Sequence, residues 1–388
     1  MQKPILLFLL AVIILPSVLS QSAADAGNKM IWFQASYRGD VVSNTSGGLE
    51  TGTWYLGMAN LRIAFNTEAA GLWKGGQFFI NACNTHGEMP SVNYIGDFQR
   101  VSNIEAGNHT FLEELWYKQT TRLVEVTAGL QDLNIDFAYT SNGALFLNSS
   151  FGVPPTISSN IPAPVFPLTS LGASARWFLS KKSTLLTAVF DGTPTDFEDN
   201  PYNVHWDFEN SGLLIFAEYQ YSLGGSRPGT YKAGAFVHQH LKENTDTVSD
   251  RDQVYRNNYG LYVVADQVIW KPLVGNRSLS VFGQFGISPK SLNFNPYYAG
   301  LGFRYSGLLD MHGNDAIGLA VAYAGLRNNS YNETTMELTC KIPVMKQVFL
   351  QTDIQYVLHP AGTDQTLSNC LVAILRIAID LSSDQFLK

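Results

Sequence analysis

The sequence has little cysteine and few charged side chains. Cys83, Cys340 and Cys370 are its only cysteines, and no cysteine or histidine pair has the short spacing of a zinc site. Three cysteines, an odd number and few for the length of the chain, do not indicate a fold that disulfides hold together, although one disulfide would be possible. Only 15% of the residues are charged and the formal net charge is −7, which argues against nucleic acid as a partner.

Motifs of the common enzyme classes are lacking as well. The sequence contains no GxSxG, HExxH, P-loop or EF-hand pattern. His238 and His240 share an i, i+2 face that a metal could use, but a position at the rim of a sheet is the favoured interpretation. We therefore expect a protein that is not an enzyme and that has neither a metal site nor a cofactor.

Long apolar runs are absent except at the N-terminus. Lys3 precedes an uncharged apolar run over 5–15, and small residues around Ser20 suit a signal peptidase. This pattern predicts a secretory signal peptide over 1–20; an uncleaved anchor is the alternative, but the run is much shorter than the roughly 20 residues of a membrane-spanning helix. Cleavage would remove Lys3 and make the net charge one unit more negative.

An alternation of apolar and polar residues with period two dominates the rest of the chain. Leu213, Ile215 and Ala217 alternate with residues that include Glu218, for example, and the same rhythm recurs along the sequence. This pattern is typical of strands with one apolar and one polar face. A soluble sandwich would also show it.

Three further observations favour a membrane barrel. Aromatic residues, such as Tyr55, Tyr117 and Tyr305, lie near strand ends, as in the girdles of outer-membrane barrels. Charges stand in mid-strand on the polar face, where a water-filled lumen accepts them and a packed core does not. The connections alternate between short and long. We therefore predict an all-β fold, a single closed antiparallel transmembrane β-barrel over 21–388, in the outer membrane of a bacterial cell.

About sixteen strands fit the pattern. Their expected ranges are 31–44, 53–66, 77–86, 111–119, 122–131, 171–178, 184–190, 213–221, 231–239, 259–268, 279–286, 297–305, 316–324, 333–341, 348–356 and 370–381. The connections at one end are longer on the whole, and that end would be the outer one, so both termini would be periplasmic.

The third of the long connections, 132–170, has an unusual composition. Its aromatic and aliphatic residues, among them Phe137, Phe146 and Phe151, need a packing surface, and several prolines stiffen it. A loop of this length is normally functional. We expect it to fold inward and narrow the pore; an external cap over the mouth is the alternative.

The sequence resembles the carbohydrate-selective porins of the OprB type. The opening GDVVSNTSGG (39–48) and TGTWYLG (51–57), then ELWYKQ (114–119), DLNIDF (132–137) and ALFLNSSFGVPP (144–155), carry the resemblance, and DIQYVLHPAGTD (353–364) closes it. The match runs over nearly the whole mature chain in the expected order. It implies a sixteen-stranded outer-membrane barrel that passes glucose or related sugars by facilitated diffusion, as a trimer or as a monomer.

The chain also departs from the family pattern. Thr127 and Ser174 stand where many relatives have arginine, and Leu130 where they often have lysine or glutamine, so the constriction is expected to be less basic. Leu381 stands where the family usually has a terminal Phe, and recognition by the barrel-assembly machinery would then depend on a variant signal that includes Phe386.

A neutral sugar must be selected by rings that stack on its C–H face and by polar groups that bond its hydroxyls. Alternation from Leu115 and Tyr117 places Glu114 and Trp116 inward, and both match the family motif. We expect Trp116 to stack on sugar and Glu114 to accept hydroxyl protons. The alternative is that Glu114 pairs with a wall arginine and braces the barrel.

Further candidates line the same lumen. Arg176 and Arg376 match family positions and point inward, whereas Arg62 and Arg304 are inward by pattern alone; structural ion pairing is the alternative, favoured for Arg304. Glu218 and Asp266 also match the family, with ligand contact and wall stabilisation as equal alternatives. On the loop, Asn134 is a candidate hydroxyl partner, and Asp132 would serve either a sugar or the local turn.

The sequence thus favours passive diffusion of small, glucose-like carbohydrates through an outer-membrane channel. Its partners would be monosaccharides, outer-membrane lipid and the barrel-assembly machinery, and it would act as a homotrimer or as a monomer. A non-selective or ion-preferring porin is the main alternative. An outer-membrane hydrolase and a soluble periplasmic sugar binder are weaker ones.

Overall fold

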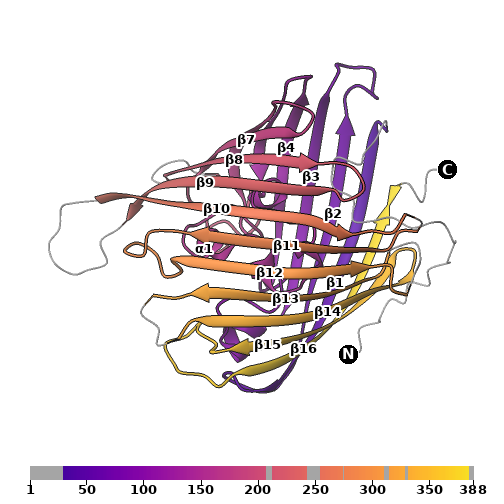
Figure 1. Cartoon of the computed structure of the whole chain (residues 1–388). Helices are drawn as coiled ribbons and strands as arrows, with labels where there is room; N and C mark the ends of the chain where they lie inside the picture. Colours follow the sequence, from indigo (N-terminus) through magenta and orange to yellow (C-terminus); the bar gives the residue numbers. More distant parts are fainter. Residues whose placement is uncertain are drawn as a thin grey trace, which may run out of the picture.

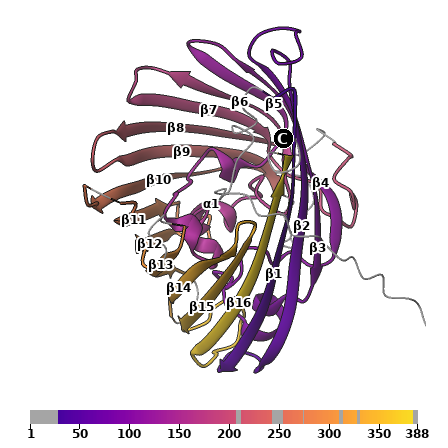
Figure 2. The same cartoon turned by 90° about the vertical axis from the view of Figure 1, so that its right-hand side faces the viewer.

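The computed structural model describes residues 29–206, 212–242, 254–273, 275–309, 314–327 and 331–383. The expected signal peptide (1–20) and Phe386 lie outside these residues, so their roles stay predictions. Sixteen antiparallel strands form one closed barrel in sequence order, as predicted (Figures 1 and 2). Strand β1 closes the barrel against β16, with Asp40 opposite Arg376 in the register.

Most strands begin and end within two or three residues of the predicted ranges. Their bounds are β1 (Ile31–Ser46), β2 (Gly52–Asn66), β3 (Gly76–Gly87), β4 (His109–Thr120), β5 (Val124–Gln131), β6 (Ser170–Phe178), β7 (Ser183–Asp191), β8 (Leu213–Leu223), β9 (Gly229–Lys242), β10 (Val254–Trp270), β11 (Ser278–Ile287), β12 (Tyr297–Ser306), β13 (Ala316–Gly325), β14 (Glu333–Met345), β15 (Val348–Leu358) and β16 (Cys370–Ser382). The largest differences are at β10, which begins five residues before its predicted start, and at β14, which ends four residues after its predicted end.

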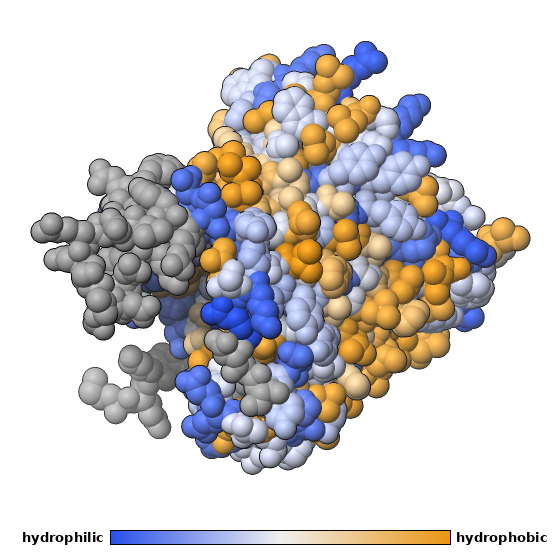
Figure 3. Space-filling model, turned by 60° about the vertical axis from the view of Figure 1, so that its left-hand side comes forward, coloured by the Kyte–Doolittle hydropathy of each residue, from blue (hydrophilic) through white to orange (hydrophobic). Residues whose placement is uncertain are grey.

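The strand alternation separates an apolar outer face from a more polar inner one. On β12, Leu301 and Phe303 are exposed on the outer wall, while Tyr298 of the same strand faces inward and is fully buried. Apolar side chains cover much of the wall that Figure 3 shows. The alternation in the sequence therefore does correspond to an outside and an inside of the cylinder.

The connections differ strongly between the two rims. The rim where β1 begins and β16 ends carries short turns such as 121–123 and 179–182, and the opposite rim carries 88–108 and 132–169. Short helices interrupt the long connections: a π-helix η2 (Ser91–Ile95), the 3₁₀ helices η3 (Leu133–Ile135), η4 (Gly143–Leu145) and η5 (Ser149–Phe151), and α1 (Pro155–Ser158). No helix among the described residues is long and apolar enough to span a membrane.

The long connection 132–169 lies inside the barrel. In Figure 2 the strands surround α1, which this connection contributes. Its Phe137 packs on Phe216 of β8, with ring centroids 5.5 Å apart, in a cluster that includes Phe190 and Phe236. Burial of a Phe side chain contributes roughly 2–3 kcal/mol, so several such rings hold the segment firmly. One side of the lumen, along β7 to β13, is therefore dry packed protein rather than water.

Wall glycines allow this close approach. A Cβ atom on Gly318 of β13 would lie 2.6 Å from the ring of Phe146, and one on Gly286 of β11 would lie 2.1 Å from the Thr156 hydroxyl. Both distances are too short for any larger residue unless the loop shifts. The three cysteines are free.

Candidate functional site

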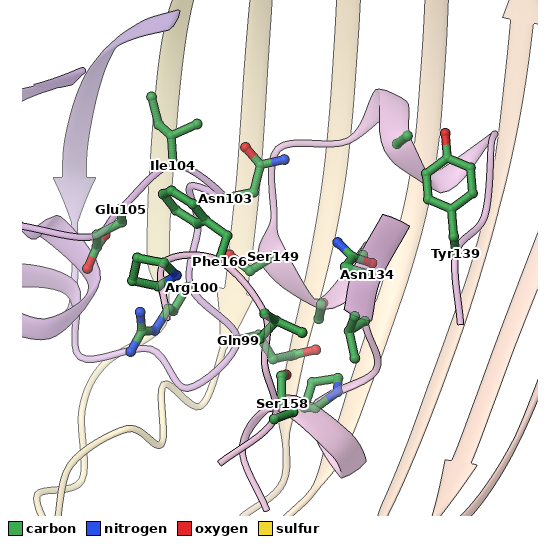
Figure 4. A pocket seen from close by; sticks show the side chains of 18 of the residues that line it. Gln99, Arg100, Asn103, Ile104, Glu105, Asn134, Tyr139, Ser149, Ser158 and Phe166 are labelled. Atoms are coloured by element: carbon green, nitrogen blue, oxygen red, sulfur yellow. The ribbon is translucent and has the colours of Figure 1, made fainter. Parts of the chain in front are cut away.

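A cavity of about 600 Å³ lies between the inserted loops and the wall. The connection 88–108 contributes its residues 98–100 and 103–105, and the connection 132–169 supplies most of the facing side. The wall residues that line it are Arg38, Met58, Asn60, Arg62, Glu113 and Arg376. In Figure 4, Arg100 and Asn103 lie toward one side and Asn134 and Tyr139 toward the other.

Two wall carboxylates hold the connection 132–169 by its backbone. Glu218 of β8 accepts the Ala138 N–H (2.7 Å). Asp266 of β10 accepts the Thr140 hydroxyl (2.7 Å), and from Asn142 both the backbone N–H (3.1 Å) and the side-chain amide (2.8 Å). Both carboxylates are buried. These contacts support the wall-stabilising alternative for Glu218 and Asp266.

A third carboxylate, which the sequence analysis did not single out, extends the same pattern. Glu337 of β14 accepts the backbone N–H groups of Leu147 (2.6 Å) and Asn148 (3.0 Å). Gln355 of β15 accepts the Asn148 side-chain amide (3.1 Å). The loop is thus bonded to β8, β10 and β14, which lie on one side of the barrel.

Wall cations hold carbonyl groups of the same segment. Lys232 of β9 donates to the Tyr139 carbonyl (2.7 Å), and Arg304 of β12 donates to the Ser141 carbonyl (3.4 Å). Arg304 forms no ion pair among the described residues, and its contact with the loop backbone is a structural one, so the ion pairing favoured for it stays a prediction.

The connection 88–108 also enters the barrel, which the sequence analysis did not predict. Glu333 of β14 accepts the N–H groups of Phe98 and Gln99, both at 2.8 Å. Arg376 makes two hydrogen bonds to Asp40 (2.6 and 2.7 Å), and a third to Asn103 of the loop (2.9 Å). The inward placement of Arg376 agrees with the prediction, and its pairing with Asp40 is structural.

Buried carboxyl groups lie within this second loop. Glu105 accepts the Ser91 and Val92 N–H groups at 3.0 and 3.4 Å. Burial raises the pKa of Glu105 to about 7, and the nearby charge of Asp97 adds to the increase. Burial likewise raises the pKa of Asp97 to about 6.

Glu114 and Trp116 lie in the wall of β4, behind the cavity. A bulge opposite Asn81 and Ala82 of β3 breaks the alternation, so that both Glu113 and Glu114 are buried. Asn81 donates to Glu113 (2.8 Å) and to Glu114 (3.2 Å). Of the two, only Glu113 lines the cavity, and no sequence pattern marks a bulge of this kind.

The ring of Trp116 already packs against another aromatic ring of the wall. It stacks on Phe79 with centroids 4.8 Å apart, and its indole N–H donates to Glu114 (3.1 Å). Only 8% of Trp116 is exposed. These contacts favour a bracing role for Glu114 and Trp116.

Arg62 and Asn134 both line the cavity. Arg62 of β2 donates to the Gln34 amide oxygen (3.3 Å). The side-chain oxygen of Asn134 is buried and has no partner among the described residues. Asp132 caps η3 by accepting the Asn134 N–H (2.7 Å), as the local-turn alternative predicted, and burial raises its pKa to about 7.

Arg176 lies away from the cavity. It pairs with Asp136 of the loop and, at 3.7 Å, with Glu125 of β5, beside a second and much smaller hollow that Thr127 and Ser174 also line. The cavity thus brings together three of the nine predicted site residues, Arg62, Asn134 and Arg376. The others hold the loop or brace the wall.

Solved structures share this fold. Pseudomonas putida OprB in its high-pH structure matches with a TM-score of 0.80 at 20% identity, over 92% of this chain and 96% of that one. Its low-pH structure matches with a TM-score of 0.60 at 18% identity, over 92% and 95%. A variant of the Rhodopseudomonas blastica porin matches with a TM-score of 0.52 at 12% identity, over 91% and 100%.

Comparison with curated protein sequences finds no match. The model of the carbohydrate-selective porin OprB family, in contrast, matches residues 50–381. This range contains fifteen of the sixteen strands and both inserted loops. The chain therefore belongs to the OprB family of carbohydrate-selective porins, channel proteins of the bacterial outer membrane.

Proposed function

We propose that this porin passes monosaccharides by passive diffusion and that the 600 Å³ cavity is the narrowest part of its path. The observation that carries the proposal is the insertion of two loops, each bonded to wall side chains, which leaves a small wet space beside dry packed protein. A cavity of this volume suits a small ligand. No energy source is involved.

The cavity lining has the two kinds of groups that a sugar needs. The amide side chains of Asn60, Asn103 and Asn134 and the guanidinium of Arg62 offer hydrogen bonds to hydroxyl groups, while Phe98 and Phe166 offer apolar surfaces to C–H faces. The Asn134 side chain lines the cavity, and its amide is of the kind that bonds a hydroxyl. Binding must remain weak for release, so we expect dissociation constants in the millimolar range.

A liposome-swelling series tests this proposal. Arabinose, glucose, sucrose and raffinose should enter at rates that fall steeply from monosaccharide to trisaccharide. Glucose should also block the ion current in a planar bilayer in a graded way. Equal swelling rates across the series, together with current unaltered by glucose, would contradict a monosaccharide-sized and sugar-binding constriction.

One variant pair separates the cavity from the wall behind it. Asn134→Ala removes a cavity acceptor and should weaken glucose block. Glu114→Ala alters a residue that contacts Asn81 and Trp116 in the wall, and should reduce stability with little effect on size discrimination. The opposite result would move the sugar contact to Glu114.

The surroundings of the barrel belong to the same proposal. The apolar wall would contact outer-membrane lipid, the long connections would face the outside, and the barrel-assembly machinery would fold the chain. Trimer and monomer stay open alternatives, because a lipid-facing and a subunit-facing wall have the same apolar character. Light scattering of the detergent-solubilised protein distinguishes them.

A further inference from the structure

Several basic side chains along the lumen form no ion pair within the described part of the chain. Arg62 and Arg100 line the cavity, and no carboxylate among the described residues lies within ion-pair distance of either. The same is true of Lys232, Arg304 and Lys341 on the inner wall of β9, β12 and β14. Lys341 instead lies over the ring of Phe349, 4.4 Å from its centroid.

The acids of the same region are covered. Glu105 and Glu113, which line the cavity, are 3% and 7% exposed, and their oxygens accept backbone or amide N–H groups. Asp40 is fully buried against Arg376. The charge of Asp40 is balanced by Arg376, and oxygens of Glu105 and Glu113 are engaged by amide N–H groups of the protein instead of a solute.

Arg100 is held in position by its backbone. Its φ of 59° lies in the left-handed region, which a residue with a side chain seldom adopts. Its carbonyl accepts the Ser149 N–H of the other inserted loop (2.9 Å), which fixes the contact between the two loops. Costly backbone conformations of this kind persist where the surroundings enforce them, often at binding sites. Figure 4 shows Arg100 beside Asn103 and Gln99 at the cavity.

We propose that the channel prefers anionic monosaccharides, sugars that carry one carboxylate, over neutral sugars of the same size. The unpaired guanidinium groups of Arg62 and Arg100 attract the carboxylate, because a narrow cavity lined by charge of one sign concentrates the opposite ion. Amide groups of the same cavity bond the ring hydroxyls. This inference rests on the proposed function, since it names the substrate class of the same cavity.

The negative net charge of the whole chain is compatible with a preference for anionic sugars. Acids at the mouth, such as Glu50, Glu88 and Asp364, are exposed to solvent. Salt screens exposed charges within about 10 Å at 0.1 M ionic strength. The charges that face a solute in the narrow cavity are close to it and less screened.

Two measurements on the wild-type protein test the proposal. In a planar bilayer with a KCl gradient, the reversal potential should show chloride permeating faster than potassium at 0.1 M, and this preference should weaken at 1 M salt. In liposome swelling with osmotically matched solutes, potassium glucuronate should enter liposomes that contain this protein faster than liposomes that contain a potassium-selective porin. In competition, glucuronate should block the ion current at lower concentration than glucose.

The double variant Arg62→Gln and Arg100→Gln locates the effect. It should lower the ratio of glucose to glucuronate blocking concentrations by about threefold or more, since charge-lined clefts concentrate counter-ions tenfold or more. Arg122→Gln, in an exposed turn outside the cavity, is the matched control and should leave this ratio unchanged. Gel mobility of unheated samples checks that each barrel has folded.

The outcomes separate the two proposals. A wild-type channel that is blocked by glucose but is cation-selective, or that glucuronate blocks no better than glucose, would overturn the anion preference and leave the proposed function standing. A double variant that keeps the wild-type ratio would also overturn it. Failure of glucose to enter or to block would overturn the proposed function itself.

Discussion

At the scale of single residues, charge in this porin is mostly used to hold chain segments together. The Arg376–Asp40 pair joins β16 to β1 at the seam of the barrel and also bonds Asn103 of the inserted loop. Both partners are buried, and a buried charge that loses its partner is costly. The pair therefore links closure of the cylinder to the position of a loop.

Replacement of Arg376 by Met should destabilise the barrel by about 3–5 kcal/mol, because Asp40 would remain buried without a countercharge. Urea unfolding followed by gel mobility measures the loss. The double variant Asp40→Asn with Arg376→Met should recover part of it, since the uncompensated charge is then gone. A single variant with wild-type stability would show that Asp40 is not held by this pair.

Glu105 gives the stability of the inserted loop a pH dependence. Its pKa in the folded protein is raised by burial to about 7, from an ordinary value of 4.5, while Asp97 adds to this shift and Arg100 opposes it. The folded state then binds more protons than the unfolded state between these values, so its stability falls as pH rises from about 4.5 to 7. Asp97 changes stability in the same direction.

We therefore expect Glu105→Gln to raise stability relative to the wild type at pH 8, by an amount on the order of 2 kcal/mol, and to change it little at pH 5. Melting temperatures from circular dichroism at pH 5, 6, 7 and 8 provide the test. Asp97 still titrates in the variant, so its melting temperature should keep a smaller dependence on pH. Parallel curves for the two proteins would refute the assignment.

At the scale of elements, a long segment without extended regular structure is held by wall side chains. Glu218, Asp266 and Glu337 accept backbone N–H groups of the connection 132–169, and Lys232 and Arg304 donate to its carbonyls. A segment of short helical turns leaves many backbone groups unpaired by itself. Carboxyl, ammonium and guanidinium groups of the wall supply the partners that a sheet would otherwise provide.

Asp266→Ala removes the acceptor of the Thr140 hydroxyl and of the Ser141 and Asn142 N–H groups. Each lost charged hydrogen bond costs about 1.5–3 kcal/mol, so the segment should loosen. We expect larger, noisier single-channel conductance and faster entry of sucrose. Glu68→Ala, in an exposed turn, is the control. Wild-type conductance in Asp266→Ala would mean that the aromatic contacts alone position the loop.

At the scale of the whole molecule, the barrel has an unequal interior. The inward side chains of β7, β8 and β9, such as Phe190, Phe216 and Phe236, are apolar and meet the inserted loop. The inward side chains near the seam, such as Arg38 and Arg62, are polar and meet the cavity. The proposed transport path therefore follows one side of the cylinder rather than its centre.

The outer wall should tolerate no charge at mid-depth. Leu301, in the middle of β12, is 53% exposed on the lipid-facing side, and Arg in its place should destabilise the barrel by about 2–4 kcal/mol. Leu301→Met keeps an apolar contact with lipid and serves as the control. Folding into vesicles at graded urea concentrations measures both. Equal stability of the Arg and Met variants would contradict a lipid-facing position.

Much of the architecture follows from local sequence. An alternation of period two is a property of neighbouring residues, so sixteen ranges could be placed before any contact was known. In LLTAVF (185–190) and LLIFA (213–217) most positions on both faces are apolar, so the alternation that ends at Glu218 is weak within these runs. Strands covered on both faces have this character, which indicates that protein packs against their inner side.

The sequence by itself determined the strands, their inner and outer faces and the unequal rims, because these depend on spacing along the chain. The tertiary structure alone decided which acids hold loops and which cations remain free for a solute. The deciding bonds join residues 80, 126 and 190 positions apart, as between Ala138 and Glu218, Thr140 and Asp266, and Leu147 and Glu337. No local pattern specifies such pairs, because closure of the barrel creates their proximity.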